Sequence, residues 1–344
     1  MRGEDIKAFR EGRSLNQPEF AGWLNKNLGR KYDKAKISRW ENGTEKVPAP
    51  VISFILKEKI GIVTKHGPAL ICVAANRKGG VGKTAFTVNT ASLLAKHFKV
   101  LLIDADPQAN ATIHLGINSI QREREEKTLY YALRASVEAH RAHGKAFDLS
   151  EYIVTTDGGL DVIPSGMRLG DAEAELQSQS SGDCALRECL DDGARQTYDF
   201  IFVDTPPHFG MLTRNALTAA TTVVIPCQTE MLSVTGVEFL LENLDMIRRR
   251  ANPGVNVIGI LPTMFNARLT QDQASLDDIR RLFGVKMRIF DPIPRATVYA
   301  QAVAAGQAAL AAVPDAPGYE VYQSVVDALI QERTRMPEVM TNVA

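Results

Sequence analysis

Residues 77–84, with the sequence Arg-Lys-Gly-Gly-Val-Gly-Lys-Thr, have the composition of a loop that binds phosphate. Its three glycines allow successive backbone N–H groups to point at one anion. Lys83 is placed to reach the β- and γ-phosphates of a nucleotide, and the Thr84 hydroxyl to bind Mg²⁺. A plain glycine turn between two core elements is the alternative. The combination of the glycines with Gly-Lys-Thr favours phosphate binding.

Two elements would position this loop. An apolar run at residues 69–75 predicts a buried strand, and residues 88–95 have the spacing of a helix. The first turn of that helix adds the positive end of its dipole to the site. Strand, glycine turn and helix form the context that a phosphate-binding loop requires.

Two further buried-strand patterns end in acidic residues. One ends at Asp104, with Asp106 two residues later, and the other ends at Asp204, before Thr-Pro-Pro. The carboxyl ends of parallel strands form the edge where nucleotides bind in open α/β sheets. Asp204 is therefore expected on the Mg²⁺ side of the site, directly or through water. Helix capping is the alternative for Asp104 and Asp106.

The alternation of strands and helices continues along the chain. Apolar runs at 222–226 and 255–262 predict two more buried strands, with a helix at 237–250 between them. This pattern predicts an α/β fold with a doubly wound, mostly parallel sheet.

The loop at residues 78–84 resembles the deviant Walker A loop of the ParA/MinD family of ATPases. Arg77 stands where the strict Walker A pattern has glycine, and Lys78 adds a second lysine. Asp-Ala-Asp-Pro-Gln at 104–108 is similar to the family's switch I. Asp-Thr-Pro-Pro at 204–207 is similar to its Walker B strand and switch II.

The resemblance to ParA extends over roughly residues 69–335. It includes Pro164-Ser165 followed by Ala-Glu-Ala-Glu-Leu at 172–176, whose chemistry the sequence does not explain. The family implies that Lys78 crosses a dimer interface to the partner's nucleotide. It also implies that Asp106 positions the attacking water and that Asp104 supports the Mg²⁺ shell.

The resemblance thus implies ATP or ADP and Mg²⁺ as cofactors, with a defined set of site residues. The expected nucleotide-binding residues are Lys78, Gly79, Gly80, Val81, Gly82, Lys83, Thr84, Ala85, Asn266, Pro294 and Arg295. The expected catalytic residues are Lys78, Lys83 and Asp106, and the expected Mg²⁺ residues are Thr84, Asp104 and Asp204. Asn266, Pro294 and Arg295 follow from the family's adenine and ribose loops, with plain strand-end loops as the alternative.

The first 50 residues are more basic than the rest of the chain. They hold eleven Lys or Arg and seven Asp or Glu, an excess of +4 in a chain whose formal net charge is zero. Affinity for nucleic acid would therefore come from local patches. Apolar residues at helical spacing predict a small all-α domain here.

Residues 15–21 and 36–43 resemble the helix-turn-helix of Cro and repressor proteins, with Ile37 and Trp40 anchoring the recognition helix. About six extra residues separate its two parts, so we expect an enlarged turn. The residues expected to contact DNA are Gln17, Lys34, Lys36, Ser38 and Arg39. A basic helical bundle used for dimerisation or partner binding is the alternative.

The sequence therefore predicts a helix-turn-helix domain at 1–50, a helix and linker at 51–68, and a ParA-like ATPase domain at 69–344. The four cysteines lack the spacing of a zinc site, and a reduced, cytoplasmic location is expected. The resemblance to ParA implies association with the nucleoid. No secretory signal or transmembrane run is expected, so no membrane partner is predicted.

The resemblance implies a partition ATPase for plasmid or chromosome segregation. ATP would close a homodimer that binds DNA non-specifically, with basic clusters at 248–250 and 280–288 as candidate contacts. A ParB-type partner would stimulate slow hydrolysis, and the helix-turn-helix would bind an operator and repress the partition genes.

Three other functions are open. The chain could be a transcription factor for which nucleotide is only a conformational ligand. It could be a metabolic or metal-cluster enzyme of the same superfamily, which the cysteine spacing disfavours. It could be a MinD-like membrane ATPase, but the amphipathic segment at 319–330 has an acidic polar face that favours core packing.

Overall fold

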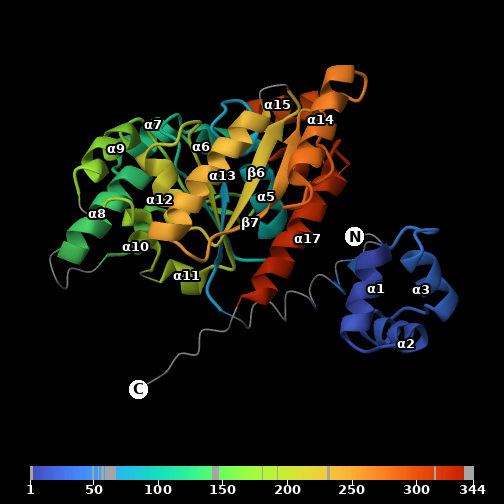
Figure 1. Ribbon diagram of the computed structural model, residues 1–344. Helices are drawn as coiled ribbons and strands as arrows, with labels where there is room; N and C mark the ends of the chain where they lie inside the picture. The colour runs from blue at the N-terminus through green and yellow to red at the C-terminus, as the bar shows by residue number, and fades with distance from the viewer. Residues whose placement is uncertain are drawn as a thin grey trace. The chain divides into compact units, whose positions relative to one another are not determined.

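The computed structural model describes residues 3–336 except 49, 53, 56, 57, 59–66, 142–146, 180, 192, 231, 232 and 314. The chain forms two compact units, residues 1–66 and 67–344 (Figure 1). Most of the predicted linker at 63–68 lies outside the described residues. The helix expected at 51–60 is described in part, and residues 51, 52, 54, 55 and 58 are helical.

The first unit contains three well-delimited helices. Asn16 and Glu19 form a reciprocal capping box at the start of the second helix, and Gly29 ends it in the left-handed conformation, at φ 61°. Asp33 caps the third helix by accepting from the Lys36 N–H at 2.8 Å. The helices are α1 (Gly3–Gly12), α2 (Gln17–Leu28) and α3 (Lys34–Glu41).

Apolar side chains from all three helices fill the core of the first unit. Its buried members are Ile6, Phe9, Phe20, Ala21, Leu24, Ile37, Trp40, Val51 and Ile55. Ile37 and Trp40 are both fully buried, as the helix-turn-helix resemblance implies. Val51 and Ile55 show that the helix after residue 50 packs in this core.

The segment between α2 and α3 differs in part from the expected enlarged turn. Asn27 and Leu28 belong to α2, so some of the extra residues lengthen the first helix of the pair. The connection proper covers residues 29–33 and is held by Asn25, whose side chain bonds both the N–H and the C=O of Tyr32.

The second unit is built on one seven-stranded sheet, in the order β3-β4-β2-β5-β1-β6-β7. Every pairing in it is parallel except that of β3 with β4. The strands are β1 (Leu70–Ala74), β2 (Val100–Asp104), β3 (Val154–Thr155), β4 (Asp161–Ile163), β5 (Phe200–Asp204), β6 (Thr222–Gln228) and β7 (Asn256–Thr263). The predicted doubly wound, mostly parallel sheet is confirmed.

Helices cover both faces of this sheet. Contacts place α5, α6, α15, α16 and α17 together on one side and α8, α9, α10, α12 and α13 on the other. Figure 1 shows α12 and α13 passing in front of the strands. The helices are α5 (Lys83–Ala95), α6 (Asn110–His114), α7 (Ser119–Arg124), α8 (Leu129–Arg141), α9 (Leu169–Gln177), α10 (Ala185–Asp191), α11 (Ala194–Thr197), α12 (Met211–Ala219), α13 (Ser233–Arg250), α14 (Thr270–Phe283), α15 (Thr297–Ala304), α16 (Ala309–Ala312) and α17 (Tyr319–Arg335), with a 3₁₀ turn at η1 (Leu149–Tyr152).

The central strands are buried along their whole length, as expected for parallel strands with helices on both faces. The predicted C-terminal helix, α17, buries Tyr322, Val325 and Leu329, in agreement with core packing. Among the described residues, no helix is both long enough and apolar enough to span a bilayer.

Substituting the core of the first unit should destabilise that unit alone. Both tryptophans, Trp23 and Trp40, lie within residues 1–66, so tryptophan fluorescence reports only this unit. Ile37→Ala removes a fully buried side chain and should lower the free energy of unfolding by about 2–5 kcal/mol. The urea midpoint by fluorescence should therefore fall.

The matched control is Leu101→Ala, which removes a fully buried side chain from β2. It should move the far-UV circular dichroism transition and leave the fluorescence transition in place. Equal shifts of the fluorescence midpoint in both variants would contradict the division into two units.

Candidate functional site

The site lies at the carboxyl edge of the sheet, where three central strands end in register. Ala74 of β1 and Asp104 of β2 are both register partners of Asp204 in β5. Parallel pairing therefore places the two predicted carboxylates beside each other and beside the segment that follows β1. This is the edge at which nucleotides bind in open α/β sheets.

The glycine loop has the backbone that phosphate binding needs. Gly80 and Gly82 have φ angles of 75° and 85°, which side chains other than glycine rarely adopt. Lys83 begins α5, so the N-terminus of that helix opens toward the loop. Thr263, the last residue of β7, donates from its hydroxyl to the Val81 carbonyl at 2.8 Å and holds the loop from behind.

Lys83 is buried with little to compensate its charge. It is 7% exposed, and its Nζ makes one long hydrogen bond, 3.4 Å, to the Lys78 carbonyl. Burial lowers the pKa of Lys83, while the charges of Asp204 and Asp106 oppose that shift. An ammonium group held in this way is suited to an anion such as phosphate.

Thr84 and Asp204 are in direct contact. The Thr84 hydroxyl donates to Asp204 Oδ2 at 2.7 Å, and Asp204 is fully buried. Burial, followed by the negative charge of Asp104, raises the pKa of Asp204 to about 8. A cation beside this carboxylate would favour its ionised form.

These groups suit Mg²⁺ as part of a site shared with phosphate. Among residues that the structure describes, no three His, Cys, Asp or Glu side chains gather as a metal site. Mg²⁺ commonly takes one or two protein oxygens together with water and phosphate oxygens. Thr84 and Asp204 offer a hydroxyl and a carboxylate at the phosphate loop, so the donor set fits.

Asp104 fixes the shape of the loop that follows β2, which was expected to be switch I. Its Oδ2 accepts from both the N–H and the hydroxyl of Thr112, at 2.8 and 2.7 Å, and its Oδ1 accepts from the Asp106 N–H at 3.2 Å. Burial raises the pKa of Asp104 to about 6, while the Thr112 hydrogen bonds oppose that shift. Both carboxylate oxygens are therefore engaged in shaping the loop that carries Asp106.

Lys78 stands at the front of the loop and forms an ion pair with Glu230 of the same chain. Its backbone N–H donates to Asn76 Oδ1 at 3.1 Å, and the Asn76 amide donates to the Pro226 carbonyl at 2.7 Å. Asn76 therefore fixes the loop to the end of β6, and the Lys78 side chain, about one third exposed, remains accessible.

A mostly apolar pocket of about 230 Å³ adjoins the phosphate loop. Gly82 and Ala85 line it together with Pro294, Arg295 and Tyr299. Asn266 lies in a neighbouring pocket of about 280 Å³, which Arg295 also lines. The three residues expected near adenine and ribose thus all border pockets near the loop, with Asn266 set apart from Pro294.

The residues expected to contact DNA lie at the start of α2 and along α3, and several have partners within the first unit. The Gln17 amide donates to Glu41 Oε2 at 2.8 Å, in a buried network with Arg10. Glu45 pairs with both Lys36 and Arg39. Gln17 is therefore used inside the unit, whereas the two basic side chains are held together on its surface.

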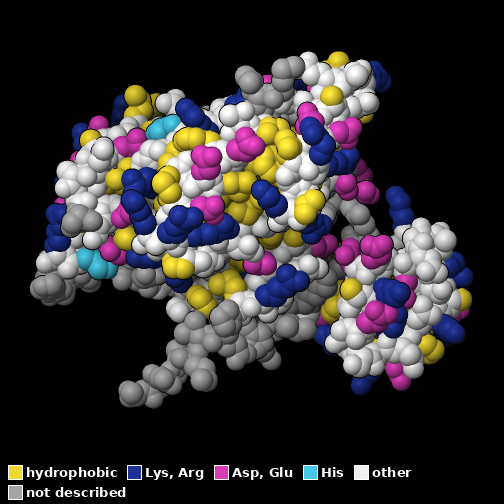
Figure 2. Space-filling model, viewed as in Figure 1, with side chains coloured by type: hydrophobic (Ala, Val, Ile, Leu, Met, Phe, Trp, Pro, Cys, Tyr) yellow, Lys and Arg dark blue, Asp and Glu magenta, His cyan; other side chains and the backbone are white. Residues whose placement is uncertain are grey.

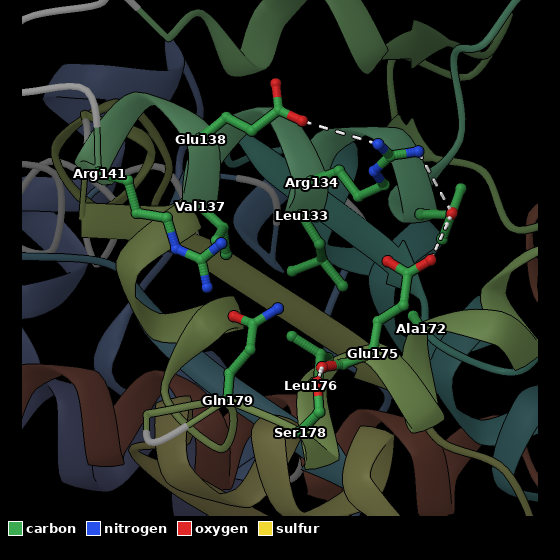
Figure 3. A pocket seen from close by; sticks show the side chains of 11 residues that line it. Leu133, Arg134, Val137, Glu138, Arg141, Ala172, Glu175, Leu176, Ser178 and Gln179 are labelled. Atoms are coloured by element: carbon green, nitrogen blue, oxygen red, sulfur yellow. Dashed lines mark hydrogen bonds and ion pairs between the residues drawn. The ribbon is translucent and has the colours of Figure 1, made fainter.

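Another pocket, of about 270 Å³, lies between α8 and α9 (Figure 3). Arg134, Arg141, Glu175 and Gln179 surround it, with Leu133 and other apolar side chains between them. It shares no lining residue with the two pockets at the phosphate loop. We therefore assign it no part in nucleotide binding.

Three contacts at the site were not expected from the sequence. Thr112 anchors Asp104, Glu230 pairs with Lys78, and Ser165 donates to the Asp106 carbonyl at 2.7 Å. Ser165 belongs to the unexplained segment noted above, which was a usable signal. Nothing in the sequence around Glu230 marks it, because it reaches Lys78 only through the pairing of β1 with β6.

Comparison with known proteins identifies the family. The family profile described as AAA domain matches residues 69–257. The chain is 35% identical over 253 residues to the sporulation initiation inhibitor protein Soj of Bacillus subtilis, covering 73% of this chain and 94% of Soj. It is 34% identical over 272 residues to the chromosome partitioning protein ParA of Caulobacter vibrioides, covering 78% and 97%.

The chain belongs to the ParA family of partition ATPases. The family recognised from the loop and strand-end motifs is thereby confirmed. The profile match begins at residue 69, so it does not reach the helix-turn-helix of this ParA-family protein, which stays a prediction.

Solved structures support the same fold. A cobyrinic acid a,c-diamide synthase from Mycobacterium smegmatis with bound ADP and magnesium is 28% identical, with a TM-score of 0.62 over 78% of this chain and 98% of that one. Cyanothece McdA is 23% identical, with a TM-score of 0.67 over 76% and 97%, which speaks to fold alone. Because differently named proteins share this fold, function rests on the site and the sequence relatives.

The contact between Thr84 and Asp204 predicts a Mg²⁺-specific defect. Thr84→Ala removes a hydroxyl that is in place to bind the metal, and it should weaken MgATP binding by about 10- to 100-fold. Binding of ATP in the presence of EDTA should change by less than about threefold, because the phosphate contacts are intact. Fluorescent nucleotide titrations with and without Mg²⁺ measure both affinities.

Thr90→Val is the control. Thr90 lies further along α5, and its buried hydroxyl has no hydrogen-bond partner among the described residues. Its loss should leave both affinities unchanged. A Thr84→Ala variant with equal losses with and without Mg²⁺ would argue against the metal role.

Proposed function

We propose that this protein is an ATPase that dimerises on ATP and segregates plasmid or chromosomal DNA. The observation that carries the proposal is the convergence of Lys83, Thr84 and Asp204 at the edge of the sheet, with a second lysine, Lys78, at the front of the same loop. Membership of the ParA family supports it. Relatives solved with ADP or an ATP analogue and magnesium support these as its cofactors.

Each part of the site has a role in this proposal. The N–H groups of residues 79–85 and the Lys83 ammonium bind the phosphates, and Thr84 and Asp204 hold Mg²⁺. Mg²⁺, when bound, neutralises charge that develops on the transferred phosphoryl group. Asp106, whose Oδ1 accepts from the Gln108 N–H at 3.0 Å, positions the attacking water.

Lys78 provides the dependence of dimerisation on ATP. In one chain its ammonium pairs with Glu230, and both side chains are between one third and one half exposed. Exposed ion pairs contribute about 0–1 kcal/mol, so the pair is weak enough to exchange. The phosphates in a partner subunit carry more negative charge and would compete for Lys78.

Pro294 and Arg295 would lie against adenine and ribose. The pocket that they line opens beside Gly82 and Ala85, and apolar side chains dominate it. An aromatic base fits a pocket of this kind. Asn266, which borders the next pocket, is proposed as a polar contact on the ribose side.

Non-specific DNA binding would use basic residues near the ends of α13 and α14. Arg249, Arg250, Arg280, Arg281 and Lys286 are all exposed. Among the described residues, Arg280 and Arg281 pair with acids one turn away in their own helix, at 3.8 and 2.6 Å. Figure 2 shows Lys and Arg side chains spread among hydrophobic ones on the face that carries α13. Contacts of this kind would make DNA binding depend on salt.

The first unit would add operator binding and repression of the partition genes. Lys34, Lys36, Ser38 and Arg39 all belong to the capped helix α3. The hydrogen bond from Lys36, followed in size by that from Arg39, lowers the pKa of Glu45. The Glu45 carboxylate thereby holds both basic side chains at one place. DNA phosphates would replace Glu45 as their partner.

A ParB-type centromere-binding protein is the proposed activator of hydrolysis, in a nucleoid-associated cytoplasmic setting. The relatives named as chromosome partitioning proteins support this assignment. Slow turnover without an activator would allow the ATP dimer to stay on DNA. This arrangement is tested by measuring ATP turnover in the presence of DNA alone, of the partner alone and of both together.

Removing Lys78 should separate nucleotide binding from dimerisation. Lys78→Ala should bind MgATP within about threefold of wild type, because Lys83 and the glycine loop are unchanged. It should stay monomeric at saturating MgATP, where wild type is a dimer. Light scattering coupled to size exclusion measures the mass.

Glu230→Gln is the opposing variant. It frees Lys78 from its ion pair and should favour the dimer by about fivefold or less. If Lys78→Ala formed the MgATP dimer as readily as wild type, the proposed role of Lys78 in the dimer interface would be contradicted.

Arg39 tests the DNA-binding role of the first unit. Arg39→Ala should lower affinity for DNA from upstream of the protein's own gene by about tenfold, since a good base contact is worth about 1–3 kcal/mol. ATP turnover should not change. Glu45→Gln should act in the opposite direction by freeing Lys36 and Arg39.

Lys26→Ala serves as the control, because it removes one positive charge from α2 rather than from α3. Gel-shift titrations at fixed salt compare the variants on upstream and random DNA. Equal losses of affinity for upstream DNA in Arg39→Ala and Lys26→Ala would show that overall charge, and not a base contact by Arg39, causes the effect.

A further inference from the structure

The segment from Pro164 to Leu176 contacts both loops that border the nucleotide site. The segment stood out in the sequence without an explanation. Its two ends meet different partners. Ser165 binds switch I, whereas Glu173 binds His208, in the loop that follows Asp204, and Leu212, in the first turn of α12.

The first contact fixes Asp106. Ser165 is fully buried, and its hydroxyl donates to the Asp106 carbonyl at 2.7 Å. Its backbone N–H donates to the Thr112 hydroxyl at 2.9 Å, and that hydroxyl in turn donates to Asp104. Ser165 therefore joins a continuous hydrogen-bond network that sets the shape of switch I.

The second contact fixes the other loop. Glu173 Oε1 accepts from the Leu212 N–H in the first turn of α12, and Oε2 contacts His208 Nε2, both at 3.2 Å. Gly210 precedes α12 and has no side chain with which to cap it. The Glu173 carboxylate thus caps α12 from a different helix and meets the positive end of its dipole.

Gly210 makes this approach possible. A Cβ atom at that position would collide with the Glu173 carboxylate and with the His208 ring. The glycine is thus required for close approach rather than for its backbone angles, since its φ is −91°. Glu173, His208 and Gly210 form one small contact between α9 and switch II.

The element between the two contacts is firmly anchored. α9 buries Leu169, Ala172 and Leu176 in the main core of the second unit. Ser165 and Glu173 are eight residues apart on this anchored segment. Both switch loops are therefore bonded to the same rigid support, and a displacement of one loop relative to the other would strain one of the two contacts.

We propose that Ser165 and Glu173 are positioning residues for ATP hydrolysis. They hold the two switch loops in a fixed position relative to each other across the site. Neither is assigned a contact with nucleotide. The inference rests on the proposed roles of Asp106 and of the loop after Asp204.

Glu173→Ala tests the proposal against a matched control. Glu175→Ala removes the same side chain two residues later on α9, where the carboxylate instead accepts from the Tyr130 hydroxyl at 2.8 Å, as the dashed line in Figure 3 shows. Glu173→Ala should lower kcat by about tenfold, because the loop after Asp204 loses its support, and leave MgATP affinity within about twofold. Glu175→Ala should change neither.

Two more variants separate positioning from general damage. Glu173→Gln retains an oxygen for the Leu212 N–H and should restore kcat to within about threefold of wild type. Gly210→Ala should displace the carboxylate and lower kcat as Glu173→Ala does. The double variant should be no slower than either single one, because both remove one contact.

The readouts are steady-state turnover, nucleotide titration and thermal unfolding of the full chain with and without MgATP. Equal kcat losses for Glu173→Ala and Glu175→Ala, or parallel losses of kcat and MgATP affinity, would overturn the proposal. Additive losses in the double variant would also do so. A failure of the proposed function shows first in wild type, as absent ATP turnover, whereas a failure of this inference shows only in the variants.

Discussion

The structure depends on the parallel register of β1, β2 and β5, which brings two buried carboxylates together at one edge of the sheet. Asp104 and Asp204 are fully buried, and Lys83 nearly so. Charges in such a place are costly unless they are paired or bonded. The raised pKa values of both aspartates and the lowered pKa of Lys83 express that cost. A site with these properties is completed by a polyanion together with a cation.

The two buried aspartates are stabilised by different hydrogen-bond partners. Asp104 accepts three hydrogen bonds and becomes the anchor of switch I, whereas Asp204 is bonded by hydroxyl groups of α5. Asp104 therefore has a structural task, and its support of the Mg²⁺ shell stays a prediction. Ser165 and Glu173 also have structural contacts, because they bond to the segments after β2 and β5.

The sheet and its covering helices are shared with proteins of several names, so the fold limits function without fixing it. The identity over most of the length of Soj and ParA narrows the choice to partition ATPases. The first unit is the feature of this chain that the family profile does not reach. Its core contains Val51 and Ile55, so the helix expected at 51–60 packs on this unit.

The sequence by itself determined the sheet, the order of strand and helix, the phosphate loop and Asp204, because apolar period and glycine spacing act locally. The partners of Lys78, Asp104, Gln17 and Glu173 were decided only by tertiary structure. The pairs of Lys78 with Glu230, Gln17 with Glu41 and Glu173 with Leu212 join residues far apart in the chain, and no local pattern records such a pairing. Asp104 bonds to residues two and eight positions later, and only the folded loop brings these groups to its carboxylate. The extra residues before α3 show the same limit, since part of them continues α2 where the core and Gly29 allow it.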